Sequence, residues 1–365
     1  MTDAPTKRTP LYQSHLDLDG RMVPFGGWEM PLHYGRQLEE HQAVREKAGV
    51  FDVSHMGQVR MRGEKALAFL DRLVPGRVGK LGDGDCLYTT LCTEDGGVVD
   101  DLIVTRLLES EVFAVVNAAT KDDDVAWIRK VCGELDYTGT VEITDESDRW
   151  GMVAVQGPEA FAPLEMVIPD FDWAGAKSFT LHQIQWEGAP LLISMTGYTG
   201  EKGAELLAPA DQTKLLWARL LKNGARAAGL GARDSLRLEK GFPLYGQDLS
   251  REISPFEGGI GWTLALDKEA GFVGKEALKQ QKKSGVPRKR IGLKTGSRRP
   301  LRSGDKVLRD GEEIGEITSG GFSPTLNEGI GLAIVNAEAA SEEKLTISSR
   351  GKEIEVSVTK PPFVK

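Results

Sequence analysis

A strand–glycine–helix pattern occurs twice in this chain and constrains its fold more than any other feature. Val59–Leu70 reads VRMRGEKALAFL and Val153–Leu164 reads VAVQGPEAFAPL. In both copies alternating apolar residues predict a strand, and a glycine, Gly63 or Gly157, separates that strand from a helical stretch. A fainter copy, FVGKEAL, occupies 272–278. The copies are too far apart for a solenoid, whose repeats span ~20–50 residues. The pattern therefore predicts two related α+β units in the first two-thirds of the chain, with chance similarity as the alternative.

Apolar periodicity and glycine or proline stops predict the remaining elements. The spacing predicts helices at Gln37–Lys47, Ala66–Val74, Thr213–Asn223 and Ala232–Lys240. It predicts strands at Gly97–Leu107, Val112–Asn117, Trp150–Val155, Pro190–Met195 and Arg290–Leu293, and a hairpin of Lys344–Ser348 and Glu353–Thr359 around Arg350-Gly351.

Length and charge restrict the function classes. A chain of 365 residues predicts two or three domains at ~150 residues each. Its net charge of −8 argues against general nucleic-acid binding, which depends on neutralising phosphates. The N-terminal residues lack a signal or transit pattern, and no apolar run reaches the ~20 residues that span a bilayer. We therefore expect a cytoplasmic protein that binds neither nucleic acid nor membrane.

Several common catalytic and binding motifs do not occur. Asp234 stands where GxGxxG would require its third glycine after Gly229-Leu230-Gly231, so a dinucleotide loop is not predicted. The three cysteines and five histidines form no CxxC, HExxH or other ligand spacing, so we expect no metal site.

The segment Lys279–Arg302 carries ten basic residues and no acidic one. It precedes a β-rich, helix-poor end, so it is interpreted as the entrance to a separate C-terminal β domain. From composition alone a solvated linker is favoured. The alternative is a docking surface for an acidic partner.

Polar groups beside glycines form four candidate site clusters. In GGVVDDLIV, strand alternation sends Asp100 and Asp101 to opposite faces, so we expect one carboxylate to point inward beside Val99 and Ile103 and the other to be solvated. An inward carboxylate is a candidate for proton transfer, because its desolvation is costly unless it is paired or used. The alternative is a strand-end turn with two exposed acids.

The other three clusters contain a glutamate, an arginine and a histidine. Glu205, after the TGYTGEKGA loop, would accept two parallel N–H bonds from an amidine-like ring edge, or would form a salt bridge at a rim. Arg233 falls in a first helical turn, where the helix dipole disfavours a cation, so a carboxylate partner or ligand is expected. His55 in FDVSHMG has no companion nucleophile and is interpreted as a structural, hydrogen-bonding histidine.

Taken in order, these segments resemble the T-protein family of the glycine cleavage system, the aminomethyltransferases. The matching stretches are TPLYQSH (9–15), FGGWEMPLHY (25–34), GVFDVSHMG (49–57), GGVVDDLIV (96–104), VVNAAT (115–120), VQGPEA (155–160), TGYTGEKGAE (196–205), GLGARDSLRLE (229–239), PLYGQDL (243–249), ITSGGFSPTL (317–326) and TKPPFVK (359–365). They run from one end of the chain to the other in the family's order, which makes the resemblance specific.

The resemblance implies an α+β fold: a three-domain cloverleaf of two related α+β domains and a C-terminal β-barrel-like domain around a central channel. It implies a first domain at 1–50 and 140–228, interrupted by the second. The second, with the folate cleft, would occupy 51–139 and 229–278, and the barrel-like domain 279–365.

The resemblance also implies the reaction and its residues. The methylene of the S-aminomethyldihydrolipoyl group of lipoylated H-protein would pass to tetrahydrofolate as co-substrate, giving 5,10-methylenetetrahydrofolate, ammonia and dihydrolipoyl H-protein. Asp101 would be the catalytic carboxylate, Glu205 would bind the pterin and Arg233 would support that end of the site. The cleft would be lined by Met56, Tyr88, Val115, Asn117, Tyr198 and Trp262.

Two alternatives keep the fold and change the function. One is a folate-dependent demethylase module, which the resemblance associates with a fused flavin domain. The other is a folate-binding paralogue acting in RNA modification or iron–sulfur assembly. The pair Asp100-Asp101 together with Glu205 and Arg233 favours the transferase, because a protein that only binds folate would not require the acid.

Overall fold

The computed structural model describes residues 6–349 and 351–365, which divide into two compact units. One unit holds the described residues of Met1–Leu70 together with Val78–Tyr88 and Leu102–Asp234. The other holds Asp71–Arg77, Thr89–Asp101 and Ser235–Lys365. The expected domain boundaries near 50, 140, 228 and 278 stay predictions.

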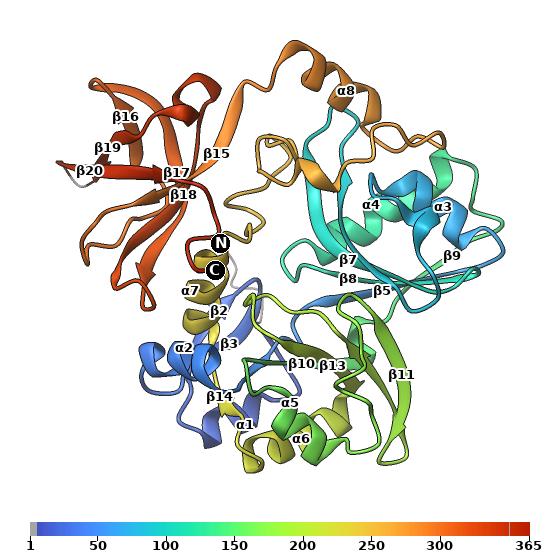
Figure 1. Ribbon diagram of the computed structural model, residues 1–365. Helices are drawn as coiled ribbons and strands as arrows, with labels where there is room; N and C mark the ends of the chain where they lie inside the picture. Colours follow the sequence, from blue (N-terminus) through green and yellow to red (C-terminus); the bar gives the residue numbers. More distant parts are fainter. Residues whose placement is uncertain (1–5, 350) are drawn as a thin grey trace. The chain divides into compact units, whose positions relative to one another are not determined.

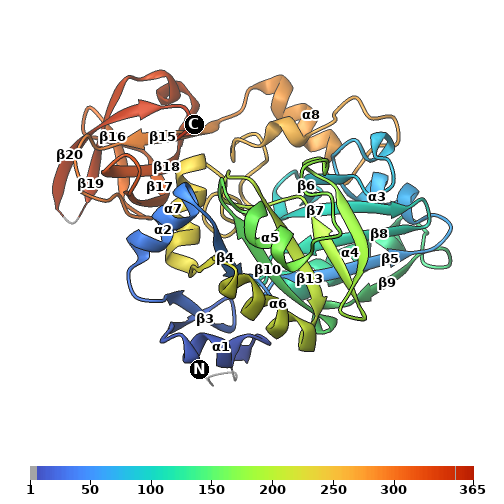
Figure 2. The ribbon, with the colours of Figure 1, turned by 60° about the horizontal axis from the view of Figure 1, so that its bottom comes forward.

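A six-stranded sheet forms one layer of the first unit, in the order β11-β12-β13-β10-β4-β14. Helices α5 (Phe161–Val167) and α6 (Ala210–Lys222) pack together beside β10 and β13, as Figures 1 and 2 both show. Their apolar faces and the sheet bury one core that includes Trp173, Trp217 and Leu216. The strands are β4 (Gly49–Asp52), β10 (Trp150–Gln156), β11 (Leu181–Trp186), β12 (Ala189–Ser194), β13 (Gly203–Pro209) and β14 (Arg226–Ala227).

A five-stranded sheet in the order β6-β7-β8-β5-β9 follows the same plan. Its strands are β5 (Gly57–Arg62), β6 (Cys86–Cys92), β7 (Val98–Leu108), β8 (Glu111–Val116) and β9 (Glu142–Asp145). The associated helices are α3 (Ala66–Leu73) and α4 (Lys121–Glu134). The division between the units passes through β6 and β7.

A small N-terminal sheet was not predicted. It pairs β1 (Lys7–Arg8) with β3 (Trp28–His33), and β3 with β2 (Arg21–Phe25), and it is followed by α2 (Gln37–Glu46). The short helix α1 (Tyr12–Asp17) contacts β3.

The internal repeat is confirmed in its backbone geometry. Gly63 and Gly157 both have a φ of 140°, a conformation that side chains rarely adopt. Each glycine carbonyl accepts a 3.1 Å hydrogen bond from the amide three residues later, where the helical stretch opens, at Ala66 or Ala160. A Cβ at either glycine would collide with a backbone carbonyl oxygen, so both positions require glycine. The fainter copy at 272–278 differs: it enters helix α8 (Lys275–Ser284), but no strand among the described residues leads into it.

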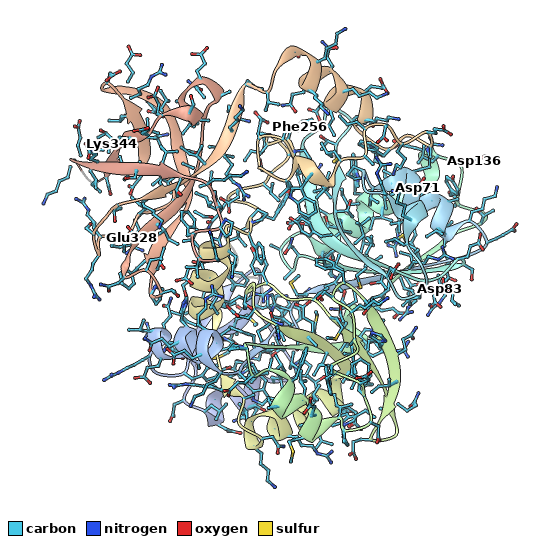
Figure 3. The ribbon with its side chains drawn as sticks, viewed as in Figure 1. Asp71, Asp83, Asp136, Phe256, Glu328 and Lys344 are labelled. Carbon is cyan, nitrogen blue, oxygen red and sulfur yellow. The ribbon has the colours of Figure 1, made fainter. Side chains whose placement is uncertain are left out.

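The C-terminal part of the second unit is a closed barrel, which confirms the β domain predicted from the sequence and the barrel-like form that the family resemblance implied. Its strand order is β15-β18-β17-β16-β19-β20, with β15 (Arg288–Lys294), β16 (Lys306–Arg309), β17 (Glu312–Ser323), β18 (Glu328–Asn336), β19 (Lys344–Ser349) and β20 (Lys352–Thr359). Figure 3 labels Glu328 and Lys344, the first residues of β18 and β19, at separate places on the barrel. The hairpin of β19 and β20 is confirmed, although Arg350 of its turn lies outside the described residues.

Polar side chains of α7 (Leu230–Lys240) attach this helix to the barrel strands. Arg237 donates to Ser319 Oγ at 3.0 Å, and the carboxylate of Glu239 accepts from Ser323 Oγ at 2.6 Å and Thr325 Oγ1 at 2.9 Å. The backbone carbonyl of Glu239 also accepts from the Phe363 amide at 2.8 Å, which anchors the C-terminal residues.

Candidate functional site

Glu205 lies on β13 opposite Ser194 of β12 and Ala154 of β10, and it is half-buried. Its Oε2 accepts a 2.6 Å hydrogen bond from Thr196 Oγ1, which lies 2.7 Å from Ser194 Oγ. These two hydroxyls therefore orient the carboxylate. Within the described part of the chain its other oxygen, Oε1, has no hydrogen-bond partner, so it is open to an N–H donor.

Arg233 lies close to Glu205, whose carboxylate is the kind of partner that the sequence predicted for this arginine. Burial lowers the pKa of the Arg233 guanidinium, and the negative charge of Glu205 opposes that effect. The guanidinium carbon lies 4.7 Å from the ring centroid of Tyr198, a cation–π geometry. Nη1 of Arg233 is buried and has no hydrogen-bond partner among the described residues. The structure thus brings Tyr198, Glu205 and Arg233 together, and Oε1 of Glu205 and Nη1 of Arg233 keep hydrogen-bonding capacity for a ligand.

The loop that carries Tyr198 is held on both sides. Thr199 Oγ1 donates to Gln156 Oε1 at 2.9 Å, and Arg45 donates to the Thr199 carbonyl and to Glu201 Oε1, each at 2.8 Å. This preorganisation lowers the entropic cost of ordering the loop around a ligand.

The start of α7 is fixed by α2. Glu40 is buried, and its carboxylate accepts from the amides of Gly229 at 2.9 Å and Tyr34 at 2.6 Å. Gln37 Nε2 donates to the Gly231 carbonyl at 2.6 Å. A Cβ at Gly229 would collide with the Leu32 carbonyl, so this glycine serves close packing rather than phosphate binding.

Three of the expected lining residues lie at one end of the five-stranded sheet. Gly57 of β5 pairs with Val116 of β8, so Met56 and Asn117 lie just beyond the end of this pairing, beside Val115. Tyr88 lies on β6 of the same sheet, and all four side chains are half-buried.

His55 precedes Met56 at that sheet end, and it lies near enough to Arg233 for the charge of the guanidinium to affect its ring. The ring is only 4% exposed and packs edge-on against Phe25, with 5.6 Å between ring centroids. Burial, with a smaller contribution from the charge of Arg233, lowers the pKa of His55 to about 4, so the ring is neutral at pH 7. The expected structural role agrees with this burial, but Nδ1 makes no hydrogen bond among the described residues.

Asp52, two residues before Ser54, was missed in the sequence. It is buried, and it accepts hydrogen bonds from Thr9 Oγ1 at 2.6 Å, His15 Nε2 at 2.8 Å and the Ser54 amide at 2.9 Å. Burial alone would raise the pKa of Asp52, but these partners outweigh it and hold the pKa below its usual value. The carboxylate therefore fixes the loop that leads to His55 and Met56. Its place in FDVSHMG was the only available signal.

Asp101 lies on β7 in the second unit and is half-buried, whereas Asp100 is fully buried. The expectation that one of the two carboxylates would be solvated is therefore wrong. Alternation does send them to opposite faces, but the neighbours of Asp100 on its own face, Val98 and Leu102, are buried as well. Both faces of the strand are covered here, which a single sequence does not reveal. The start of the strand is tied down by bonds from the Val98 amide to the carbonyls of Ser250 and Ile253, at 2.9 and 3.1 Å.

Trp262, the other expected site residue of the second unit, lies in the short 3₁₀ helix η3 (Gly261–Thr263). Its side chain is 71% exposed, which is unusual for so large an apolar group.

The basic segment Lys279–Arg302 begins within α8, crosses a turn and continues into β15. Arg288 pairs with Glu257 at 2.8 Å and Lys294 with Glu328 at 3.4 Å. Lys282, Lys283, Lys289 and Arg302 are exposed and form no ion pair within the described ranges. The segment is thus the entrance to the barrel, as predicted, and part of its charge faces solvent.

A cavity of about 400 Å³ adjoins the barrel in the second unit, where Gln247, Arg288, Lys306, Thr318 and Asn336 contribute to its lining. None of the predicted site residues lines it. Over residues 6–349 and 351–365, no cluster of three His, Cys, Asp or Glu side chains could hold a metal ion. No helix in those same ranges is long and apolar enough to cross a membrane.

Comparisons with known proteins cover nearly the whole chain. A family model described as the GCVT N-terminal domain matches residues 11–268, and one described as the glycine cleavage T-protein C-terminal barrel domain matches residues 288–365. An aminomethyltransferase of Geobacillus kaustophilus is 43% identical over 98% of this chain and 99% of its own length. One from Xylella fastidiosa is 44% identical over 98% of this chain and 97% of its own length. The crystal structure of glycine cleavage system aminomethyltransferase T from Bartonella henselae superposes with a TM-score of 0.92 at 32% identity, covering 98% of both chains.

Proposed function

Because this chain belongs to the glycine cleavage T-protein family and is an aminomethyltransferase of that system, we propose that Glu205 and Arg233 bind its tetrahydrofolate and that Asp101 is its catalytic carboxylate. The aminomethyl group arrives on the dihydrolipoyl sulfur of H-protein. The products are 5,10-methylenetetrahydrofolate, ammonia and dihydrolipoyl H-protein. The observation that supports this site best is the carboxylate of Glu205, with one oxygen oriented and the other open, beside Arg233.

The reaction is a group transfer without net oxidation. The methylene carbon lies between sulfur and nitrogen, so either heteroatom can assist departure of the other. Two C–N bonds form to the folate nitrogens while the C–N bond to ammonia and the C–S bond break, and the two folate N–H protons leave on ammonia and the thiol. The protein's task is to bring the folate nitrogens to this carbon, exclude water and handle the protons.

Glu205 binds the pterin through the ring N–H and the exocyclic amino group, two parallel donors that match a carboxylate. Glu205→Gln keeps the shape but turns one acceptor into a donor. We expect the Kd for tetrahydrofolate to rise roughly 10- to 100-fold, the usual cost of a charged hydrogen bond. Glu187→Gln, at an exposed glutamate paired with Arg219, is the control and should bind as the parent does. A Kd equal to that of the parent protein for Glu205→Gln would exclude the pterin role.

Asp101 hydrogen-bonds the N10 side of the folate, orients it and stabilises the iminium-like positive charge that develops as ammonia leaves. Charge placed in this way is worth ~3–4 kcal/mol of barrier, so Asp101→Asn should lower kcat by roughly 10²–10³ while folate still binds. Asp95→Asn, in the exposed turn before the same strand, is the matched control. Unaltered turnover in Asp101→Asn would remove Asp101 from the mechanism.

The remaining members of the proposed cleft surround the pterin and its aryl group. Tyr198 is already braced by Arg233, and Met56, Val115 and Asn117 come from one end of the five-stranded sheet. The full proposed lining set is Met56, Tyr88, Val115, Asn117, Tyr198 and Trp262.

Lipoylated H-protein is the proposed partner, and the exposed lysines of the Lys279–Arg302 segment are proposed as part of its docking face. Lys282→Gln with Lys283→Gln should weaken H-protein binding and reduce its dependence on salt, whereas Lys344→Gln on the barrel should not. Affinity for H-protein that does not change with ionic strength would contradict this surface.

A cytoplasmic location agrees with the three buried cysteines, all of which are free.

The experiment that tests the whole assignment measures ammonia release from aminomethylated H-protein with tetrahydrofolate. Ammonia and methylenetetrahydrofolate should appear together. Folate binding without ammonia release would contradict the assignment, because binding alone is shared with the demethylase and paralogue alternatives.

A further inference from the structure

Lys268 lies in a cage of backbone carbonyls within the second unit. Its Nζ donates to the carbonyl oxygens of Asp71 at 2.5 Å, Val74 at 2.7 Å and Gly76 at 3.0 Å. The side chain is 9% exposed, and a carboxylate oxygen of Asp71 lies 3.4 Å from Nζ. An ammonium has three N–H donors, so these three carbonyls use all of its hydrogen-bonding capacity. Figure 3 labels Asp71 near the end of α3.

The cage covers the end of α3 and the segment that follows it: the Asp71 carbonyl belongs to the last turn of the helix, whereas the Val74 and Gly76 carbonyls lie just beyond it. The last four carbonyls of a helix have no intrahelical donor, and they carry the negative end of its dipole. Lys268 donates to one of these helix-end carbonyls, that of Asp71, and to two carbonyls of the segment that follows, from about 190 residues away in sequence.

Two further contacts join the same two segments. The Ala265 amide donates to the Pro75 carbonyl at 3.0 Å, and Arg77 Nη2 reaches both carboxylate oxygens of Asp267 at 2.6 and 2.8 Å. Lys275 Nζ also donates to the Lys268 carbonyl. Residues 265–268 are therefore braced at several points.

The braced segment directly follows the turn that carries Trp262. This turn is closed by bonds from the Thr263 amide to the Ile260 carbonyl at 2.9 Å and from the Leu264 amide to the Gly261 carbonyl at 3.2 Å. Trp262 itself is 71% exposed, so packing of its ring into a core does not hold the turn. The carbonyl cage holds the backbone six residues further on.

We propose that Lys268 is a positioning residue for tetrahydrofolate binding: its ammonium fixes the segment 262–268 to the end of α3 and thereby holds Trp262 ready to contact the ligand. This inference rests on the proposed folate role of Trp262. Lys268 does not touch the folate and acts through the backbone of the turn.

The first test compares Lys268→Met with Lys268→Arg and with Lys344→Met, whose exposed lysine pairs with Glu355 at 2.7 Å on the barrel. Lys268→Met should raise the Kd and KM for tetrahydrofolate about tenfold and leave kcat within about twofold, because only ligand positioning is lost. Lys268→Arg should keep part of the tetrahydrofolate affinity that Lys268→Met loses. Lys344→Met should bind tetrahydrofolate as the parent does. An unchanged Kd in Lys268→Met would overturn the proposal.

A double-mutant cycle asks whether Lys268 acts through Trp262. If it does, Lys268→Met should add less than about twofold to the Kd of Trp262→Ala. A full tenfold loss on top of Trp262→Ala would show that Lys268 acts independently of Trp262, and the proposal would fail.

Chemical rescue gives a readout that general instability would not produce. Lys268→Ala leaves three carbonyls around the place of the ammonium, so added methylammonium should restore tetrahydrofolate binding to within about threefold of the parent. Tetramethylammonium has no N–H donors and should not rescue. Failure of methylammonium to improve binding would count against the cage as the cause. If the parent protein itself did not bind tetrahydrofolate, the proposed function would fail instead.

Discussion

Arg233 and Arg237 lie four residues apart on α7, yet their surroundings differ. Arg237 is 2% exposed, and its guanidinium donates to the Phe242 carbonyl at 3.2 Å, to Asp248 Oδ2 at 3.1 Å and to Ser319 Oγ at 3.0 Å. Arg233 lies over Tyr198 near Glu205, and its Nη1 has no partner among the described residues. A buried guanidinium whose two terminal nitrogens both donate hydrogen bonds contributes to stability, whereas one with an unpaired terminal nitrogen has donors available for a ligand.

Loss of Arg237 should have the larger effect on stability. Arg237→Met leaves the buried carboxylate of Asp248 without its cation, so the free energy of unfolding should fall by about 3–5 kcal/mol. Guanidinium-induced unfolding followed by circular dichroism would measure the fall. An equal loss in Arg233→Met would erase the distinction between the two arginines.

The second largest effect is expected in acid, where protonation of His55, close to Arg233, should lower the stability of the folded protein. Because the pKa of folded His55 is about 4, below its unfolded value of about 6.5, the unfolded chain binds the proton first. Stability should therefore fall as the pH drops from about 6.5 to about 4, by roughly 3 kcal/mol. Across this pH range, the midpoint of unfolding should depend less on pH in His55→Gln than in the parent protein. Arg233→Met removes a positive charge that repels protonated His55, so the loss of stability in acid should be smaller. If the stability of Arg233→Met depended on pH as that of the parent does, Arg233 and His55 would not interact.

The smallest expected change is in binding. Arg233→Met should weaken the binding free energy of tetrahydrofolate by about 1.5–3 kcal/mol, the range for a charged hydrogen bond, while the free energy of unfolding changes by less than about 1 kcal/mol. Calorimetric titration would measure the affinity for tetrahydrofolate. Normal affinity combined with severe destabilisation would reverse the roles assigned to the two arginines.

Local features of the fold were predictable because they depend on neighbours in sequence. The helix expected at Gln37–Lys47 is α2, and the strand expected at Trp150–Val155 is β10. The glycines Gly63 and Gly157 mark the repeat because their backbone conformation excludes other residues. The N-terminal sheet was missed, since β1 has two residues and is defined only by its pairing with β3.

The site was predictable only in part. Glu205 and Arg233 stood out by their places beside glycine loops, and the structure puts them near each other. The burial and ion pairing of Arg237 could not be predicted, because its partner Asp248 is brought to it by tertiary packing. The burial of Asp100 and the hydrogen bonds of Asp52 likewise depend on contacts between distant segments.

The closed barrel limits how another protein can attach to this end of the chain. Binding by addition of a β-strand requires a row of unpaired amides and carbonyls along an exposed edge, and the described strands of the barrel pair in a complete circle. Recognition there must therefore depend on side chains, so that point mutations on the barrel surface, rather than competing extended peptides, are the appropriate tools to disrupt it.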